Sequence, residues 1–402
     1  MAVETQTGPV VGTKSNGILP SALYRPEVRS VIYQIALVLI LGFAAWWVIN
    51  NIQDNLRRQN IASGFGFLDR RSGFDIAQHL IEYSSASTYG RAFLVGLLNT
   101  LLVAVLGIVF ATIIGFLVGI ARLSHNWLIA KLATAYVEVL RNMPLLLQLF
   151  FWYFAVLKSL PAPRQSLSLG AGAYLNVRGL YLPGPLPQPG FDWVLGAFIV
   201  GILASIGLSI YAKRLQRETG RQLPVFLPSL LLIIGLPLVV FVLLGAPMAF
   251  EYPQLRGFNF NGGVVILPEL MALVVGLSLY TASFIAETVR SGLMGVPKGQ
   301  TEAADALGLS RGQSLRLVII PQAMRIIIPP LTSQYLNLTK NSSLAVAIGY
   351  PDFVSVFTGT VLNQTGQAVE VILITMGVFL TISLATSFGM NWFNKRMALV
   401  ER

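Results

Sequence analysis

The stretch Gly299-Gln300-Thr301-Glu302-Ala303-Ala304-Asp305-Ala306-Leu307-Gly308 is a short polar segment between two long apolar runs. It predicts a helix with Glu302 and Asp305 in the first turn, where carboxylates favour the positive helix end. Gly308 follows at the position where a left-handed residue ends many helices. A capped helix here predicts a structured loop between two membrane segments rather than a flexible connection.

A second short helix is expected directly afterwards. Ser310 lies three residues before Gln313, which is the spacing of a capping box. This helix is predicted to run through Arg311 and Arg316 to Pro321. Two capped polar helices form a rigid loop on one membrane face, suited to receive force or a partner.

The composition is that of a membrane protein. Of the 402 residues, 54% are hydrophobic and 11% are charged, which excludes both disorder and an ordinary soluble protein. The chain has no cysteine, so disulfides and thiolate metal sites are excluded, and His79 and His125 are too few for a zinc motif. The net charge of +11 comes from basic residues clustered between apolar runs, which favours membrane orientation over nucleic-acid binding.

Apolar runs able to cross a hydrocarbon core of about 30 Å recur along the chain. The fold class expected from them is an all-α polytopic membrane protein. We expect eight spans, at residues 31–49, 92–120, 145–157, 193–211, 225–244, 267–289, 326–348 and 369–392. Residues 127–142 are amphipathic and are predicted to form an interfacial helix. The seventh span is expected to be interrupted by Pro329-Pro330 and by the polar residues 337–343.

The connections between the spans are predicted to lack regular structure. Residues 158–192 are dense in proline, residues 212–221 form a compact basic loop, and residues 246–266 form a polar turn. The predicted organisation is a tail, first helix and polar segment (1–91), a transmembrane domain (92–392) interrupted by an insertion with two extra helices (158–266), and a tail (393–402).

Lysine and arginine predict the orientation. With both termini in the cytoplasm, the inside connections carry more Lys and Arg than the outside ones. This orientation places the two-helix loop and residues 212–221 in the cytoplasm. Residues 50–91 fit it worst, because they are rich in arginine, although acidic residues balance that charge.

The two-helix loop resembles that of a known family. Glu302-Ala303-Ala304 is followed after three residues by Gly308, and then by Val318, Ile320 and Pro321. This resembles the EAA loop of ABC importer permeases, in which Glu-Ala-Ala precedes three residues, Gly, nine residues, Ile, one residue and Leu-Pro. The spacing is kept throughout, with valine and isoleucine replacing isoleucine and leucine.

Flanking residues are similar to the polar amino-acid (histidine/glutamine-type) permease subfamily. They are Glu287, Arg290, Gly299-Gln300, the stretch 306–310, Pro321-Gln322-Ala323, Pro329-Pro330, the stretch 340–344 and the stretch 141–146. That subfamily commonly has five spans. The added N-terminal helix and the insertion 158–266 resemble the Q-type permeases of general L-amino acid transporters of Gram-negative bacteria.

The resemblance implies a type I ABC importer transmembrane domain in a bacterial inner membrane. Its implied partners are a second, similar permease, a dimer of cytoplasmic ATP-binding subunits, a periplasmic amino-acid-binding protein and membrane lipid, with no nucleic acid. ATP and Mg would be used by the ATPase, so this chain is expected to be no enzyme and to bind no cofactor. The residues implied for ATPase coupling are Gly299, Gln300, Glu302, Ala303, Ala304, Asp305, Ala306, Leu307 and Gly308.

Polar residues inside two spans are candidates for the substrate pathway, because polar groups at that depth must be satisfied or face water. They are Ser278, Tyr280 and Thr281 in the sixth span, and Asn337, Thr339, Lys340, Asn341 and Ser342 in the seventh. Two interpretations stay open. Lys340 either meets a substrate carboxylate or lines a gate, or it forms an internal ion pair or snorkels while the hydroxyls join helices. Glu287 and Arg290 are expected to pair at i,i+3. Arg141 either anchors the interface, which we favour, or receives the coupling loop.

Three alternative functions are considered. A secondary carrier would need ionisable relay residues and inverted repeats, and Lys340 and Glu287 alone are candidates. A membrane enzyme is disfavoured because the sequence shows no HExxH motif, no Gly-x-Ser-x-Gly elbow and no cysteine nucleophile. A non-conducting structural half of a heterodimeric permease would carry the same motifs.

Overall fold

The computed structural model describes residues 26–58 and 63–397. The chain divides into two units, residues 1–65 with 365–370, and residues 66–364 with 371–402. Residues 1–25 of the N-terminal tail and 398–402 of the C-terminal tail, both expected in the cytoplasm, lie outside the described residues.

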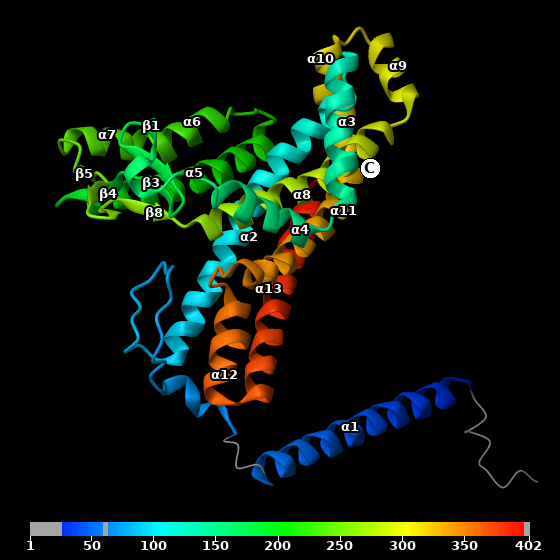
Figure 1. Cartoon of the computed structure of the whole chain (residues 1–402). Helices are drawn as coiled ribbons and strands as arrows, with labels where there is room; N and C mark the ends of the chain where they lie inside the picture. The colour runs from blue at the N-terminus through cyan, green and yellow to red at the C-terminus, as the bar shows by residue number, and fades with distance from the viewer. Residues whose placement is uncertain (1–25, 59–62, 398–402) are drawn as a thin grey trace, which may run out of the picture. The chain divides into compact units, whose positions relative to one another are not determined.

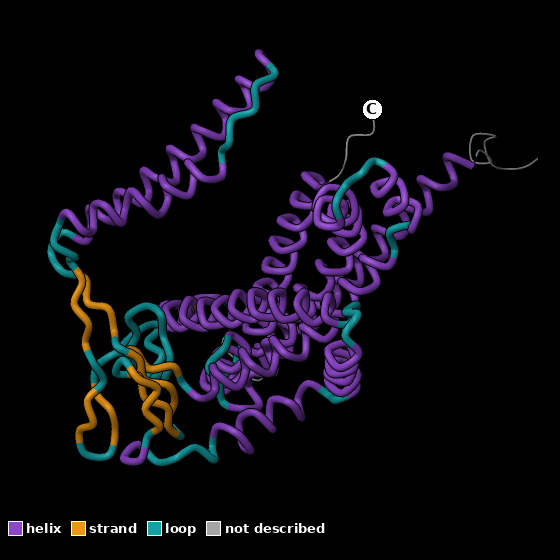
Figure 2. The backbone as a smooth tube through the Cα atoms, turned by 90° about the horizontal axis from the view of Figure 1, so that it is seen from above, coloured by secondary structure: helices purple, strands orange, loops and turns teal. Residues whose placement is uncertain are grey.

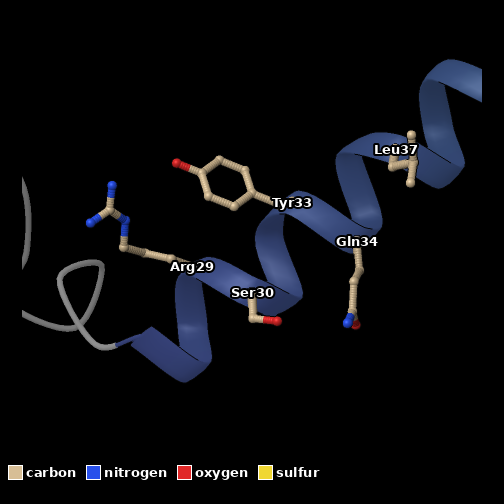
Figure 3. A pocket seen from close by; sticks show the side chains of 5 residues that line it. All are labelled: Arg29, Ser30, Tyr33, Gln34 and Leu37. Atoms are coloured by element: carbon tan, nitrogen blue, oxygen red, sulfur yellow. The ribbon is translucent and has the colours of Figure 1, made fainter.

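The first unit is built on α1 (Pro26–Arg58). Its stretch Arg29–Ile52 is apolar and long enough to cross a membrane, in agreement with the predicted first span. Figure 3 shows the first turns of this helix, where the side chains of Arg29, Ser30, Tyr33, Gln34 and Leu37 project from the ribbon. All of them come from a single helix, so they line no enclosed site. In the same unit the Gly64 N–H donates to Glu370 Oε1 at 2.6 Å.

Four long helices form the bundle of the second unit. They are α2 (Tyr89–Ala121), α8 (Pro268–Met294), α11 (Ile320–Asn341) and α13 (Ala368–Met397). Glycines let α2 approach α8 closely, because a Cβ at Gly115 would lie 2.6 Å from the Ile285 Cβ, and one at Gly119 would lie 2.8 Å from the Val289 Cβ. Substituting these glycines would therefore force the two helices apart.

A sharp bend follows α2. The helix α3 (Trp127–Asn142) is succeeded by α4 (Leu145–Phe150) and the π-helical segment η3 (Phe151–Leu157). The two parts meet at 107°. Pro144 explains the bend, because it pushes Met143 out of the helical conformation to φ −94° and ψ 131°.

The number of spans depends on this bent pair. Within the described ranges, seven helices are long and apolar enough to cross a membrane, or eight if the bent pair is one span. The count of eight, with the bent pair taken as one span, agrees with the prediction of about eight spans. Residues 127–157 then form one broken span, rather than the predicted interfacial helix followed by a separate span at 145–157.

The insertion contains a helical hairpin. Its first arm is α5 (Phe191–Thr219), and its second arm consists of α6 (Phe226–Leu230), the π-helical η5 (Leu231–Gly235) and α7 (Leu236–Leu243). Most of the predicted basic loop is wrong, because α5 continues through Lys213, Arg214 and Arg217 to a left-handed Gly220. Lysine, arginine and glutamine are good helix formers, so the helix extends until a glycine ends it.

The connections on either side of the hairpin contain short strands, so the predictions of a proline-rich loop and a polar turn are incomplete. The strands are β1 (Leu167–Gly170), β2 (Ala173–Asn176), β3 (Gly179–Leu182), β4 (Gly184–Pro187), β5 (Met248–Glu251), β6 (Gln254–Arg256), β7 (Asn259–Asn261) and β8 (Val264–Ile266). A short turn, η4 (Pro163–Gln165), precedes them. Figure 2 shows the strands gathered in one region of the chain.

The pairing of the strands joins the two ends of the hairpin. One antiparallel sheet has the order β1-β2-β3-β8, while β4 pairs with β5 and β6 with β7. Strands before the hairpin therefore pair with strands after it. Residues 158–190 and 246–266 must lie on the same side of any membrane that the hairpin crosses.

A compact segment not anticipated from the sequence connects α11 to α13. It consists of the 3-10 segment η7 (Ser342–Ile348), the π-helical η8 (Ser355–Val361) and α12 (Leu362–Thr365). Asn99 and Thr100 of α2 hold the turn before η8, because Asn99 Nδ2 donates to the Pro351 carbonyl at 2.9 Å and the Phe353 N–H donates to Thr100 Oγ1 at 2.9 Å. Phe353 and Phe357 stack at 4.9 Å in the core beneath it.

The two-helix loop consists of α9 (Lys298–Ala306) and α10 (Arg311–Ser314), which Figure 1 shows together at one end of α3. The second helix does not end at Pro321, because α10 continues through the π-helical η6 (Leu315–Ile319) into α11. Nor do Pro329-Pro330 interrupt the seventh span, since both lie inside α11. The wider π turn η6 before Pro321 accommodates its ring, and the buried neighbours Ile327, Ile328 and Leu331 stabilise the helix at Pro329-Pro330.

Candidate functional site at the EAA loop and the inner ends of the helices

The EAA loop, residues 299–308, is closed by local hydrogen bonds. Gly308 has φ +71° and its N–H donates to the Asp305 carbonyl at 2.9 Å, while the Leu309 N–H donates to the Ala304 carbonyl at 3.2 Å. Ser310 and Gln313 form the predicted capping box. The left-handed glycine and the box are therefore confirmed, and they fix the angle between α9 and α10.

The placement of the two acidic residues differs from the prediction. The helix α9 begins at Lys298 after Pro297 and has no acidic residue in its first turn. Glu302 therefore lies in the second turn and Asp305 near the end, where a carboxylate gains nothing from the helix dipole. Both side chains are exposed, so their charges are free to face a partner.

Most of the EAA loop faces outwards. Ala304 is the one residue of α9 that is buried, at 3% exposure, and Leu307 at the tip is 80% exposed. The loop is tied to α11 by a hydrogen bond of 2.9 Å from Gln322 Nε2 to Gln300 Oε1. A large apolar side chain held on a rigid polar turn suits a hydrophobic groove on another protein.

Gly308-Leu309-Ser310-Arg311-Gly312 also matches the Gly-x-Ser-x-Gly pattern of serine hydrolases. In that class the serine lies on a turn from a strand to a helix. Here the segment joins α9 to α10, and Ser310 Oγ accepts from the Gln313 N–H at 3.5 Å as a helix cap. The serine therefore has a structural role, not a nucleophilic one.

A contact not anticipated from the sequence links the EAA loop region to the turn between α2 and α3. Arg311 Nη2 lies 3.0 Å from His125 Nε2. A cavity of about 510 Å³ lies beside this contact, between α9 and the start of α10, and Asp305 and Arg311 line it. A movement of α9 and α10 would thus be transmitted to α11 and to the turn between α2 and α3.

Glu287 and Arg290 pair as predicted, and a third residue joins them. Arg290 Nη2 donates to Glu287 Oε1 at 2.6 Å, and Arg122 from the end of α2 donates to Glu287 Oε2. One carboxylate therefore pairs with two guanidinium groups, which leaves the cluster with a surplus positive charge. Arg122 was missed because its partner lies 165 positions away in the chain.

The hydroxyl groups among the candidate pathway residues lie inside the bundle. Ser278 Oγ is 3.5 Å from the Gly107 carbonyl, Thr339 Oγ1 donates to the Tyr335 carbonyl at 2.9 Å, and Ser342 Oγ donates to the Thr339 carbonyl at 2.7 Å. Thr281 is also buried, whereas Tyr280 and Asn341 are partly buried.

Two of the candidate pathway residues, Asn337 and Lys340, lie with Ser333 on an exposed polar stripe of α11. Ser333, Asn337 and Lys340 recur at the spacing of one helix face and are all exposed. Within the described part of the chain, Lys340 has no acidic partner. A polar helix face at membrane depth is costly against lipid. The stripe therefore indicates a water-filled passage or a protein surface beyond this chain.

Among the described residues, no group of three or more His, Asp or Glu residues could hold a metal ion.

Comparisons with known proteins agree with this geometry. Residues 217–399 match the family described as "Binding-protein-dependent transport system inner membrane component". The chain is 58% identical over 382 residues, 95% of each chain, to the general L-amino acid transport system permease protein AapQ of Rhizobium johnstonii.

Two further relatives match along nearly their whole length. The chain is 55% identical to the putative amino-acid ABC transporter permease protein YhdX of Escherichia coli K12, over 94% of this chain and 96% of that one. It is 41% identical to the glutamate/glutamine/aspartate/asparagine transport system permease protein BztB of Rhodobacter capsulatus, over 96% and 97%. This membrane bundle with its EAA loop therefore belongs to the binding-protein-dependent transport system inner membrane components, and the chain is a permease subunit of an amino-acid ABC importer, a transport component and not an enzyme.

Proposed function

We propose that this permease forms half of the pathway of an importer for L-amino acids, with both termini in the cytoplasm. The breadth of substrates is supported by the 58% identity to a general L-amino acid transport permease. The proposed partners are a second, similar permease, a dimer of ATP-binding subunits on the cytoplasmic side and a periplasmic amino-acid-binding protein. ATP and Mg belong to the ATP-binding subunits.

Coupling to ATP hydrolysis is assigned to the EAA loop, and the exposed tip of this loop is the observation that carries the proposal. Leu307 offers an apolar anchor at 80% exposure, and the exposed carboxylates of Glu302 and Asp305 add negative charge to the same loop. Because Gly308 and the capping box hold α9 at a fixed angle, a displacement of the ATPase is transmitted through α9 rather than absorbed.

The pathway is proposed to run along the exposed stripe of α11. Ser333, Asn337 and Lys340 point away from the core of this chain, so a second permease opposite them would enclose a polar channel. The hydroxyls of Ser278, Thr281, Thr339 and Ser342 are buried inside the bundle, and Tyr280 and Asn341 are partly buried, so these residues are proposed to support the wall of the pathway rather than to form its exposed face. This arrangement favours a conducting subunit over a structural half that passes no solute.

The coupling proposal is tested with Leu307→Asp. Burying a charge in an apolar groove without a partner is costly, so we expect uptake and the co-elution of the ATP-binding subunits to fall at least about tenfold. The matched control is Leu255→Asp in β6, a leucine that is 44% exposed and far from the EAA loop in the chain. Wild-type uptake and assembly in Leu307→Asp would refute the coupling role.

A further inference from the structure

The end of the hairpin α5–α7 that lies away from the strands carries a cluster of basic residues. Its members are exposed and lie at the end of α5 or directly after it: Lys213, Arg214, Arg217 and Arg221. Glu218 is the only acidic residue in the sequence between Asp192 and Glu251. Four basic side chains against one acidic side chain leave this end of the hairpin strongly positive.

Three members of the basic cluster have no anionic partner within the chain. Arg214 Nε donates to Glu218 Oε1 at 2.9 Å, which engages the one nearby carboxylate. In the part of the chain that the structure describes, Lys213, Arg217 and Arg221 form no ion pair. Lys213 and Arg217 are four residues apart, so they lie on one face of α5, and Arg221 follows directly after the helix ends at Gly220. Three cations are therefore available to an anion outside the chain.

The length of α5 sets the depth of the basic cluster in a membrane. Trp193, which is exposed at the start of α5, lies twenty residues before Lys213, a separation of about 30 Å along a helix. This is about the thickness of the hydrocarbon core. Tyr211 is exposed two residues before Lys213, and both Trp and Tyr are enriched at membrane interfaces. With Trp193 at one interface, the cluster lies among the lipid headgroups at the other.

The surface next to the basic cluster is apolar. Most of the apolar surface of both arms of the hairpin is not covered by the rest of the chain. Phe226 and Leu227 are exposed at the start of the second arm, directly beyond the turn. A phospholipid at this end can therefore place its acyl chains against apolar side chains while its headgroup reaches the cations.

We propose that the basic cluster binds anionic phospholipids of the cytoplasmic leaflet. Arg217 and Arg221 donate hydrogen bonds from their planar guanidinium groups to the phosphate oxygens, and Lys213 adds a compact positive charge. Basic residues just beyond a membrane helix are attracted to an anionic lipid surface, and the attraction grows with each residue. The leaflet follows from the proposed orientation, whereas the binding itself does not depend on it. The inference goes beyond the proposed function, because it assigns the insertion a lipid-binding role that is separate from the transported substrate.

The test measures the lipid preference of this one segment. The whole transporter is placed in nanodiscs of phosphatidylcholine that contain a trace of a photoreactive lipid, either phosphatidylglycerol or phosphatidylcholine with the same acyl chains. After illumination, mass spectrometry of the peptides measures the cross-linking to residues 211–227. We expect the wild type to favour phosphatidylglycerol by about tenfold or more, because the attractions of three unpaired cations add up. The preference should fall in high salt, because salt screens exposed charges.

The decisive variant combines Lys213→Gln, Arg217→Gln and Arg221→Gln. It should bring the two lipids to within about twofold of each other. The matched control combines Arg164→Gln, Arg178→Gln and Arg256→Gln, which removes the same charge from exposed positions among the strands of the same insertion. The control should keep the wild-type preference.

A single substitution keeps the proposal testable if the triple variant does not assemble. Arg217→Gln alone should lower the preference by about threefold, because the other two cations remain. Exchange of Arg217 and Arg221 for lysine keeps the charges and should retain most of the preference, since attraction to a charged surface depends mainly on charge.

Three results would overturn the proposal. The first is equal cross-linking of the two lipids to the wild type. The second is a variant that assembles, has lost the cations and still prefers phosphatidylglycerol, or a control that loses the preference to the same extent. The third is displacement of phosphatidylglycerol by inorganic phosphate beyond the effect of chloride at equal ionic strength, which would assign the cluster to a soluble anion. None of them bears on the proposed function, which fails only if the wild-type complex imports no amino acid.

Discussion

Asp352 is a carboxylic acid that the fold buries completely in the turn before η8. Its two oxygens accept hydrogen bonds from the Ser355 N–H at 2.9 Å and the Val354 N–H at 3.2 Å, so it caps the helical segment that follows. Burial raises the pKa of Asp352 to about 7, against the opposing effect of these two donors. A single residue thus ties the packing of this turn to pH.

The stability of the protein should therefore fall as pH rises from about 4 to 7. Because the pKa of Asp352 is higher in the folded chain than in the unfolded one, the folded state binds more protons in this window. Between pH 5 and 7 the free energy of unfolding should decrease by about 2–3 kcal/mol from this group. Above about pH 8, where Asp352 is ionised in both states, its contribution should change little.

Thermal unfolding of the purified protein at pH 5 and pH 7 measures this effect. Asp352→Asn keeps an oxygen acceptor for the cap but cannot ionise, so its midpoint should vary less between the two values. Asp192→Asn, at the exposed first turn of α5, is the control and should leave the wild-type dependence unchanged. An equal pH dependence in Asp352→Asn and the wild type would contradict the assignment.

At the scale of elements, features that depend on neighbouring residues could be predicted from the sequence, whereas pairings between distant segments could not. The left-handed Gly308 and the capping box at Ser310 depend on residues within a few positions, and both were predicted. The start of α9 was misplaced, because Pro297 opens the helix earlier than the acidic residues suggested. The π turn η6, which merges α10 with α11, leaves no simple pattern in the sequence.

Elements that depend on distant partners escaped prediction for a physical reason. The strand β3 has four residues and gains its place in a sheet from β8, which lies beyond the hairpin. Runs this short do not establish an alternation of apolar and polar residues. The pairing of Arg122 with Glu287 was missed in the same way, since α2 and α8 each contribute one partner.

The hairpin α5–α7 offers a test of close helix packing. A Cβ at Gly201 would overlap the carbonyl oxygen of Leu232 in η5, whereas one at Gly207 would meet nothing within 4 Å. Gly201→Ala should therefore destabilise the hairpin by about 1–3 kcal/mol through overpacking. Gly207→Ala, on the same helix, should be neutral or stabilising by up to about 1 kcal/mol, because alanine favours a helix over glycine.

Chemical denaturation, with limited proteolysis at the turn near Gly220, compares the two variants. Gly201→Ala should expose this turn to cleavage more readily than Gly207→Ala. Equal stability of the two variants would show that η5 does not approach α5 as closely as the structure indicates.

At the scale of the whole molecule, the insertion adds the lipid-facing hairpin α5–α7. The hairpin stands on the strands β1–β8, which are called the base below. Only 17% of the most apolar window of α5 and 6% of that of α6–α7 are buried within the chain. The base is joined to the bundle where β8 leads into α8 at Pro268, and the adjacent Glu269 accepts a hydrogen bond of 2.6 Å from Tyr153 Oη in η3 of the bundle. This end of α8 is opposite the EAA loop, so the base and the EAA loop belong on opposite faces of the membrane.

This arrangement predicts a definite labelling pattern. The native chain has no cysteine, so single cysteines placed at Gln188 and Arg217 report their positions without interference. Both side chains are exposed, Gln188 in the base and Arg217 near the far end of α5. A thiol reagent that does not cross the membrane, applied from the periplasmic side, should modify Gln188→Cys and leave Arg217→Cys unmodified.

After permeabilisation both should react, which shows that each thiol is accessible. Because the base and the basic end of α5 are separated by about one membrane thickness of helix, modification of both from outside would exclude a spanning hairpin. Modification of Arg217→Cys alone would show that the chain has the opposite orientation, with the EAA loop outside the cytoplasm.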